Sequence, residues 1–218
     1  MLTFGFRDAR PAVSHVLCLG AHSDDIEIGC GGTILTLLEA VQPLAVTWVV
    51  FSATGARAEE ARQSADTFLA GGAGRDVVLY DFRDGYFPYT GGAIKDRFEE
   101  LKARVSPDLV FTHHRHDLHQ DHRLLSELTR NTFRDHAILE YEIPKYDGDL
   151  GQPNVFVPLE TAVCRRKVDL LLANFGTQRS KRWFTDDLFH AHLRLRGMEC
   201  NSPSTFAEAF HGHKIVLG

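Results

Sequence analysis

The chain alternates short apolar runs with longer amphipathic runs, and this alternation constrains its fold more than any other feature. The apolar runs lack the strict alternation of a strand with one solvated face, which is typical of strands buried on both faces of a parallel sheet. We expect strands at His15–Gly20, Leu44–Ser52, Val77–Asp81, Leu109–Thr112, Ile138–Ile143 and Val155–Pro158. We expect helices at Gly32–Val41, Ala58–Ala70, Ala93–Val105, His119–Phe133, Glu160–Ala173 and Asp186–Gly197. This repetition predicts a doubly wound α/β fold with a mostly parallel sheet and right-handed crossovers.

Length and charge limit the class of protein. With 218 residues and no repeat, low-complexity tract or linker, the chain fits a single domain over residues 1–218. The formal net charge of −5 argues against a nucleic-acid partner, because such a partner requires a basic face. Composition leaves open whether the chain forms a homo-oligomer.

The sequence shows no sign of export or membrane insertion. No stretch approaches the ~20 apolar residues of a membrane span, and Met1–Asp8 lacks the apolar core of a signal segment. Cys18, Cys30, Cys164 and Cys200 are scattered without a Cys-x-x-Cys pair, so we expect free thiols. These features predict a cytoplasmic protein without a membrane span.

Two short segments dense in carboxylates and imidazoles each follow a predicted strand. The first is Ala21–Glu27, with sequence AHSDDIE, and the second is His116–His122, with sequence HDLHQDH. Of the 12 histidines, five fall between His113 and His122. In an open α/β sheet, ligands bind at the carboxyl ends of the strands, so both segments lie where a site is expected. Together they offer His/His/Asp metal ligands and a spare carboxylate, which suits metal-assisted hydrolysis.

In the first segment, His22 and Asp25 are three residues apart, so a tight turn can aim both side chains at one point. The adjacent carboxylate of Asp24 repels that of Asp25, and a divalent cation relieves this repulsion for one of them. The other is then free to act as a base beside a metal-bound water. We expect the glycines that follow to open a helix and let its backbone approach the metal; they are Gly29, Gly31 and Gly32. A solvated turn with a capping aspartate is the alternative.

In the second segment, His119 and His122 are three residues apart at the start of a predicted helix, so they share a face. Asp121 is placed to fix the tautomer of one imidazole. Asp117 either caps the helix or holds a ligand in place. If His122 joins the ligands of the first segment, an open position remains for water, as in catalytic zinc sites. The neighbouring histidines have no assigned task; they are His113, His114 and His116.

The two segments resemble the paired signatures of the LmbE/PIG-L metal-dependent N-deacetylases. Ala21–Glu27 is similar to the signature Ala-His-Pro-Asp-Asp-x-Glu, with Ser23 in place of proline, and His116–His122 is similar to the second signature. The order, the spacing and the Gly-Gly after the first segment agree with the family. The resemblance covers most of the chain as one Rossmann-like α/β domain. The exchange at Ser23 leaves the ligand set intact.

The resemblance implies that His22, Asp25 and His122 are zinc ligands. It implies that Asp24 is the general base, and that His119 stabilises the oxyanion or protonates the leaving amine. Asp121 corresponds to the residue that orients this histidine. The ligand types favour Zn²⁺, although Fe²⁺, Co²⁺ or Mn²⁺ fit the same donors.

Three further residues match the family less closely. Arg57, in the segment Thr54–Arg57, resembles part of the substrate pocket, although an Arg–Glu surface pair with Glu60 explains it as well. Asp84 follows the third predicted strand and is placed to accept sugar hydroxyls. Glu208 lies in a segment that resembles a closing segment of the family, and a structural role is open for it.

The expected reaction is hydrolysis of an amide. A bound cation lowers the pKa of its water toward ~7, Asp24 takes a proton as the water adds to the carbonyl, and His119 helps to stabilise the oxyanion. The resemblance implies removal of an N-acetyl or N-acyl group from an amino-sugar-containing small molecule or glycoconjugate. An amidase acting on a non-sugar or thiol-sugar conjugate is the alternative within this chemistry.

Three other functions compete with this interpretation. A nucleotide-binding Rossmann module would need a Gly-x-Gly-x-x-Gly after the first strand, where this chain has carboxylates instead. A two-metal phosphoesterase would need more carboxylate ligands and basic phosphate clamps. A catalytically silent relative would not need the intact base and ligand set.

Overall fold

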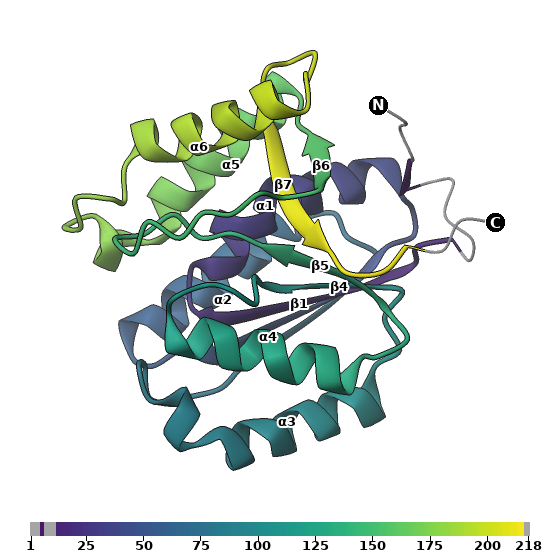
Figure 1. Ribbon diagram of the computed structural model, residues 1–218, viewed down its shortest axis with the longest axis vertical. Helices are drawn as coiled ribbons and strands as arrows, with labels where there is room; N and C mark the ends of the chain where they lie inside the picture. Colours follow the sequence, from purple (N-terminus) through teal and green to yellow (C-terminus); the bar gives the residue numbers. More distant parts are fainter. Residues whose placement is uncertain (1–4, 7–11, 216–218) are drawn as a thin grey trace.

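The computed structural model describes residues 5–6 and 12–215, which form one seven-stranded sheet between two layers of helices (Figure 1). The strands are β1 (His15–His22), β2 (Ala45–Ser52), β3 (Gly74–Leu79), β4 (Leu109–His113), β5 (Ala137–Tyr141), β6 (Val155–Pro158) and β7 (Ala207–Gly212). The helices are α1 (Asp25–Ala40), α2 (Ala56–Phe68), α3 (Gly91–Arg104), α4 (Gln120–Thr132), α5 (Thr161–Asn174) and α6 (Asp186–Glu199). Two 3-10 turns are η2 (Phe87–Tyr89) and η3 (Gly176–Gln178). The doubly wound α/β class predicted from the apolar runs is therefore confirmed.

The strand order is β3-β2-β1-β4-β5-β7-β6, and neighbours are parallel from β3 to β5. The chain moves outward from β1 to β3 and then returns to place β4 on the other side of β1. This reversal makes the carboxyl ends of β1 and β4 the topological switch point, where ligands bind in open α/β sheets.

Apolar side chains on both faces of the central strands explain why helices cover both faces. Residues of β1 and β2 alternate between two cores: Val16 and Trp48 pack with α1, α2, α5 and α6, whereas Leu17 and Val49 pack with α3 and α4. In Figure 1, α3 and α4 lie on one side of the sheet and α5 and α6 lie on the other. Burial on both faces explains the absence of polar–apolar alternation in these strands.

The edge of the sheet departs from the sequence prediction. β7 was not expected; it pairs antiparallel with β5 and with β6 and so joins two strands that do not touch. Polar residues in β7, including Glu208 and His211, interrupt the kind of apolar run by which the other strands were predicted. β3 also begins earlier than predicted, at Gly74.

The prediction that three glycines open the helix is wrong. The helix α1 begins at Asp25 and contains all of them. A Cβ on Gly29 would lie 2.2 Å from the Tyr141 ring, and one on Gly32 would lie 2.5 Å from Leu159. A Cβ on Gly31 would lie 2.7 Å from the Phe68 ring. These glycines let α1 pack closely against its neighbours.

No helix in the described parts of the chain is long and apolar enough to cross a membrane. All four cysteines are free, as expected. The expectation that Met1–Asp8 carries no signal segment concerns residues that, apart from Gly5 and Phe6, lie outside the described ones, so it stays a prediction. The same holds for the extent of the domain over residues 1–218.

We expect Gly29→Ala to destabilise the fold by about 1–3 kcal/mol, because the added methyl group would lie 2.2–2.9 Å from Cδ2, Cγ and Cβ of the Tyr141 side chain. Gly92→Ala in α3 is the matched control, since its Cβ meets nothing within 4 Å; it should be neutral or stabilising by up to about 1 kcal/mol. Urea denaturation of both variants measures the difference. Equal stabilities would contradict the close packing of α1 on β5.

Candidate active site

The two predicted segments meet at the switch point of the sheet. β1 ends at His22, and the turn at Ser23–Asp24 leads directly into α1. β4 ends at His113, and the loop after it leads to α4, whose N-cap is His119. Both segments are therefore fixed by buried elements on each side.

His22, Asp25 and His122 face one another through three ligand atoms. Nδ1 of His22 lies 3.2 Å from Nε2 of His122, and Oδ2 of Asp25 lies 3.3 Å from the first nitrogen and 3.5 Å from the second. Tetrahedral ligands at the ~2.0–2.1 Å zinc–histidine bond length are about 3.3 Å apart. All three side chains are buried. Their spacing therefore fits one metal ion of this size.

The charges at this site are strongly coupled. Burial by itself raises the pKa of Asp25, but His122, His113 and His22 outweigh it and hold this pKa well below its usual range. Burial and the neighbouring His113 lower the pKa of His122 to about 3, so this imidazole is neutral and available as a ligand. Burial opposes the charged form of His22, but Asp25 and hydrogen bonds to carboxylates raise its pKa well above the usual value.

Asp24 has a different environment from its neighbour Asp25. Its Oδ1 accepts a 2.9 Å hydrogen bond from Nη2 of Arg57, at the start of α2. Burial and the charge of Asp25 raise the pKa of Asp24 to about 6, although Arg57 and His22 oppose this. Arg57 thus pairs with Asp24 and not with Glu60, which instead accepts hydrogen bonds from Thr177.

His119 and Asp121 both lie against the ring of His22. The His119 ring stacks on that of His122 with centroids 4.6 Å apart. The Nδ1 of His119 accepts from the backbone NH of Asp121, while the carboxylate of Asp121 accepts from the backbone NH groups of Gly85 and Phe87. Asp121 also lies 3.3 Å from Nε2 of His22. Its carboxylate therefore contacts His22 rather than the ring of His119, the partner that the resemblance implied.

Asp84 lies at the mouth of the site. Its side chain is 58% exposed, and its Oδ1 lies 3.0 Å from Nε2 of His22. Hydrogen bonding to His22 is the largest influence and lowers the pKa of Asp84 to about 2, so this carboxylate is ionised. An exposed anion beside a buried cluster is available to a ligand that enters from solvent.

Sequence reasoning assigned no task to His113 or Lys145 and left Asp117 either as a helix cap or as a support for a ligand. The N-cap of α4 is His119, and Asp117 instead contacts the ring of His122. Asp117 Oδ2 lies 3.0 Å from Nδ1 of His122 and 2.9 Å from Nζ of Lys145. His113 stacks on His122 at 3.8 Å, and its Nε2 accepts from the NH of Ala21. The His-Asp-x-His pattern offers a signal for Asp117, but Lys145 follows a different strand and has none.

Other polar residues stabilise the helix and the loop that follow β1 and β4. Glu208 accepts from the backbone NH groups of Gly32 and Thr33 and from Lys167, all at 2.6–2.8 Å, which is the structural role that was left open. Glu140 on β5 accepts from the ring of His114 and from the NH of Arg115, both at 3.1 Å. His116 is exposed.

Several sets of donors in the described region are close enough to hold a metal, with ligand atoms within 4.8 Å of one another. The sets are His22–His119–His122, Asp25–His113–His122 and His22–Asp84–His119–Asp121. All lie at this one place, and His22 or His122 belongs to each of them. Imidazole nitrogens with carboxylate oxygens suit zinc and the later first-row divalent metals.

A family model described as PIG-L, GlcNAc-PI de-N-acetylase, matches residues 17–133, which is more than half of the chain. The chain belongs to the PIG-L family. This confirms the family that the two segments resemble, and the matched region contains the residues from His22 to His122. No curated protein sequence matches the chain.

Solved structures with the PIG-L-type fold share only about a fifth of the sequence, so they establish the fold alone. The N,N'-diacetylchitobiose deacetylase of Pyrococcus horikoshii is 21% identical with a TM-score of 0.69, over 96% of this chain and 87% of that one. A conserved protein of Thermus thermophilus is 20% identical with a TM-score of 0.71, over 93% and 96%. The 4-carboxy-2-hydroxymuconate hydratase of Pseudomonas putida is 19% identical with a TM-score of 0.74, over 94% and 98%.

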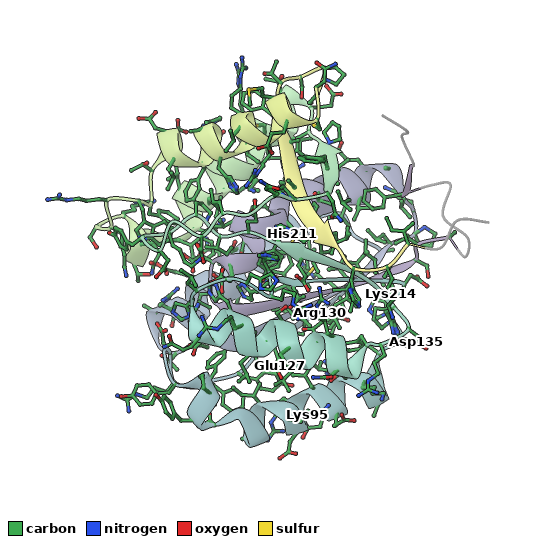
Figure 2. The ribbon with its side chains drawn as sticks, in the orientation of Figure 1. Lys95, Glu127, Arg130, Asp135, His211 and Lys214 are labelled. Atoms are coloured by element: carbon green, nitrogen blue, oxygen red, sulfur yellow. The ribbon has the colours of Figure 1, made fainter. Side chains whose placement is uncertain are left out.

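The contacts of Glu140 on β5 with His114 and Arg130 make the stability of the fold depend on pH. Burial alone would raise the pKa of Glu140, but hydrogen bonds from His114 and Arg130 lower it from 4.5 to about 2. Figure 2 shows Arg130 on α4, and its Nε binds Glu140 on β5. The folded-state pKa lies below the unfolded one, so this stabilisation is present above about pH 4.5 and is lost as pH falls toward 2.

We expect Glu140→Gln to reduce the free energy of unfolding by about 1–3 kcal/mol at pH 7, and the difference from wild type to shrink at pH 3. Glu127→Gln, at an exposed position on α4, is the control and should change little at either pH. Urea denaturation at both pH values measures this. A difference that does not depend on pH would contradict the ionised, paired state of Glu140.

Proposed function

We propose that this protein is a zinc-dependent N-deacetylase that removes an acetyl group from an amino-sugar-containing small molecule or glycoconjugate. The observation that carries the proposal is the spacing of His22 Nδ1, Asp25 Oδ2 and His122 Nε2 at 3.2–3.5 Å, with Asp24 beside them. The membership of the chain in the PIG-L family supports the reaction type. The free cysteines support a cytoplasmic location, which we retain as part of the proposal.

In this proposal, His22, Asp25 and His122 hold the cation. Zinc supplies a Lewis acid for the amide carbonyl and lowers the pKa of the attacking water. Asp24 accepts a proton from that water, and Arg57 keeps the carboxylate of Asp24 oriented through its 2.9 Å bond to Oδ1. Burial and the neighbouring Asp25 raise the pKa of Asp24 and so favour its protonated form, which suits a group that accepts a proton and later returns it.

His119 completes the set of groups around the reacting carbonyl. It is half-buried between the His22 ring and solvent, with centroids 4.9 Å apart. From there it can donate a hydrogen bond to the oxygen on which negative charge develops, or a proton to the leaving amine. Asp121 acts through the loop that it holds, because it binds the backbone of Gly85 and Phe87 beside Asp84.

The rim of the site supports a substrate larger than one sugar ring. Tyr86 and Tyr89 follow β3, Leu118 follows β4, and Tyr146 follows β5, so all extend from the carboxyl edge that carries the site. These side chains are between 41% and 81% exposed. Arg83 lies over the ring of Tyr86 at 3.6 Å and holds that ring in place. Exposed aromatic faces at a site mouth can pack on sugar rings or on an apolar aglycone.

The test is metal content by mass spectrometry together with acetate release from a panel of N-acetylated mono- and disaccharides. Near-stoichiometric metal and acetate from any panel member would support the proposal. Because a hydratase shares the fold, a conjugated enoic acid is included in the panel. Water addition to that acid without any acetate release would overturn the deacetylase assignment, and failure to bind metal after reconstitution would overturn the metal site.

We expect Asp24→Ala to lower kcat by about 10²–10⁴-fold while metal is retained, because the proposed base is lost and the proposed ligands remain. His122→Ala should lose both metal and turnover. His190→Ala on α6 is the control and should retain both. Metal analysis and acetate assays on the same preparations measure the outcome. A fully active, metal-loaded Asp24→Ala variant would falsify the assignment of the base.

We expect Tyr89→Ala to raise KM by about 3–10-fold for a disaccharide or aglycone-bearing substrate, with little change for N-acetylglucosamine itself. The reason is the loss of one stacking face, worth roughly 0.5–1.5 kcal/mol. Tyr89→Phe keeps the ring and should behave like wild type. Equal KM values for all three proteins would remove Tyr89 from the substrate surface.

A further inference from the structure

Asp117 contacts two of the three histidines of the second segment, His119 and His122. Its Oδ2 lies 3.0 Å from Nδ1 of His122, and its Oδ1 accepts a 2.8 Å bond from the backbone NH of His119. The residue is only 3% exposed. A single buried carboxylate therefore contacts a proposed ligand and the backbone of a proposed catalytic residue.

The hydrogen bond to His122 selects one tautomer of that imidazole. The Oδ2 of Asp117 that lies 3.0 Å from Nδ1 of His122 also lies 2.9 Å from the ammonium of Lys145, which only donates hydrogen bonds. An ionised carboxylate only accepts hydrogen bonds, so Nδ1 of His122 carries the proton. The lone pair on Nε2 then faces His22 and Asp25, as a metal ligand requires.

Lys145 reaches Asp117 from the loop between β5 and β6. Its Nζ lies 2.9 Å from Oδ2 of Asp117 and 2.5–2.6 Å from both oxygens of Asp149. Asp149 in turn accepts a 2.6 Å bond from the backbone NH of Leu118, the residue after Asp117. The Lys145 side chain is only 11% exposed, so water does little to screen these contacts.

The same loop is also held at its far end. The NH of Gly151 donates to Oε1 of Glu142 at 2.7 Å, and Nη2 of Arg196 donates to the carbonyl of Gly151 at 3.2 Å. These contacts hold the loop beside the segment that carries Asp117, and the loop places the ammonium of Lys145 against the Asp117 carboxylate.

We propose that Asp117 and Lys145 are a pair of positioning residues, in which Asp117 fixes the His122 tautomer and the His119 backbone, and Lys145 holds Asp117 in place from the β5–β6 loop. This inference rests on the proposed metal site at His22, Asp25 and His122. Its consequence is that metal affinity depends on a lysine that is not itself one of the proposed metal ligands.

The first experiment is a double-mutant cycle on zinc affinity, measured by competition with a chelating dye. Asp117→Asn keeps the shape but removes the charge, and we expect a loss of about 10–100-fold in affinity, as for other carboxylates behind a metal-bound histidine. Lys145→Met should cause a smaller loss. The double variant should bind zinc about as weakly as Asp117→Asn alone, because Lys145 acts through Asp117.

Matched controls are the same chemical changes away from these contacts. Asp147→Asn lies on the same loop at an exposed position, and Lys95→Met lies on α3, where Figure 2 shows it on the outer side of the molecule. Both should bind zinc like wild type. If Asp117→Asn and Lys145→Met lower the melting temperature but leave zinc affinity unchanged, the pair is only structural and the inference is overturned. Strictly additive losses would also overturn the coupling between them.

The second experiment does not depend on metal binding. Nitrogen-15 NMR of metal-free protein with labelled histidines should show His122 as the Nδ1-protonated tautomer, and a mixture of tautomers in Asp117→Asn. Wild type with His122 in the other tautomer would overturn the inference. Wild type with the expected tautomer but no zinc binding would overturn the proposed metal site and leave the positioning role standing. If Asp117→Asn does not fold, Lys145→Met decides by the same two measurements.

Discussion

One buried oxygen, Oδ2 of Asp25, lies 3.3–3.5 Å from ring nitrogens of His22, His113 and His122 and also accepts the backbone NH of His22. A buried carboxylate is costly unless positive or donating groups surround it. This contact therefore depends on β1, which ends at His22, and β4, which ends at His113, being neighbours, and on α4, which carries His122. The same demand makes the place suitable for a cation. The contacts of Asp25 therefore contribute both to the stability of the fold and to the proposed metal site, and a substitution at Asp25 would disturb both.

The order of the strands brings these groups together. β1 and β4 are adjacent because the chain winds outward to β3 and then returns. The segments that follow β2, β3 and β5 then bring Arg57, at the start of α2, and the loop residues Asp84 and Lys145 to that edge. Each of them adds one group that contacts a predicted site residue, so the site draws on every strand from β1 to β5 rather than on the two segments that first suggest it.

The surroundings of the site also separate the roles of neighbouring residues that look alike in sequence. Asp24 and Asp25 are adjacent carboxylates, yet burial beside an anion raises the pKa of the first, and three imidazoles lower that of the second. His119 and His122 belong to one segment, yet His122 is buried against Asp117 and His119 is only half-buried. Environment, more than residue type, distinguishes the members of each pair, and this is why we propose different roles for them.

The apolar and amphipathic runs were enough to predict the α/β class and the positions of most strands and helices, and the carboxylates and imidazoles at two strand ends were enough to predict the segments of the candidate site. This was possible because buried parallel strands and amphipathic helices leave periodic patterns, and because ligands at one sheet edge follow strand ends. Contacts in the folded structure were needed to show that Asp117 binds the ring of His122 and that Asp121 contacts His22 rather than the ring of His119. They were also needed to show that Lys145 supports Asp117 and that Gly29 serves close packing. The folded structure also placed β7, whose polar residues hide a strand. These features depend on contacts between elements far apart in the chain, which no local pattern records.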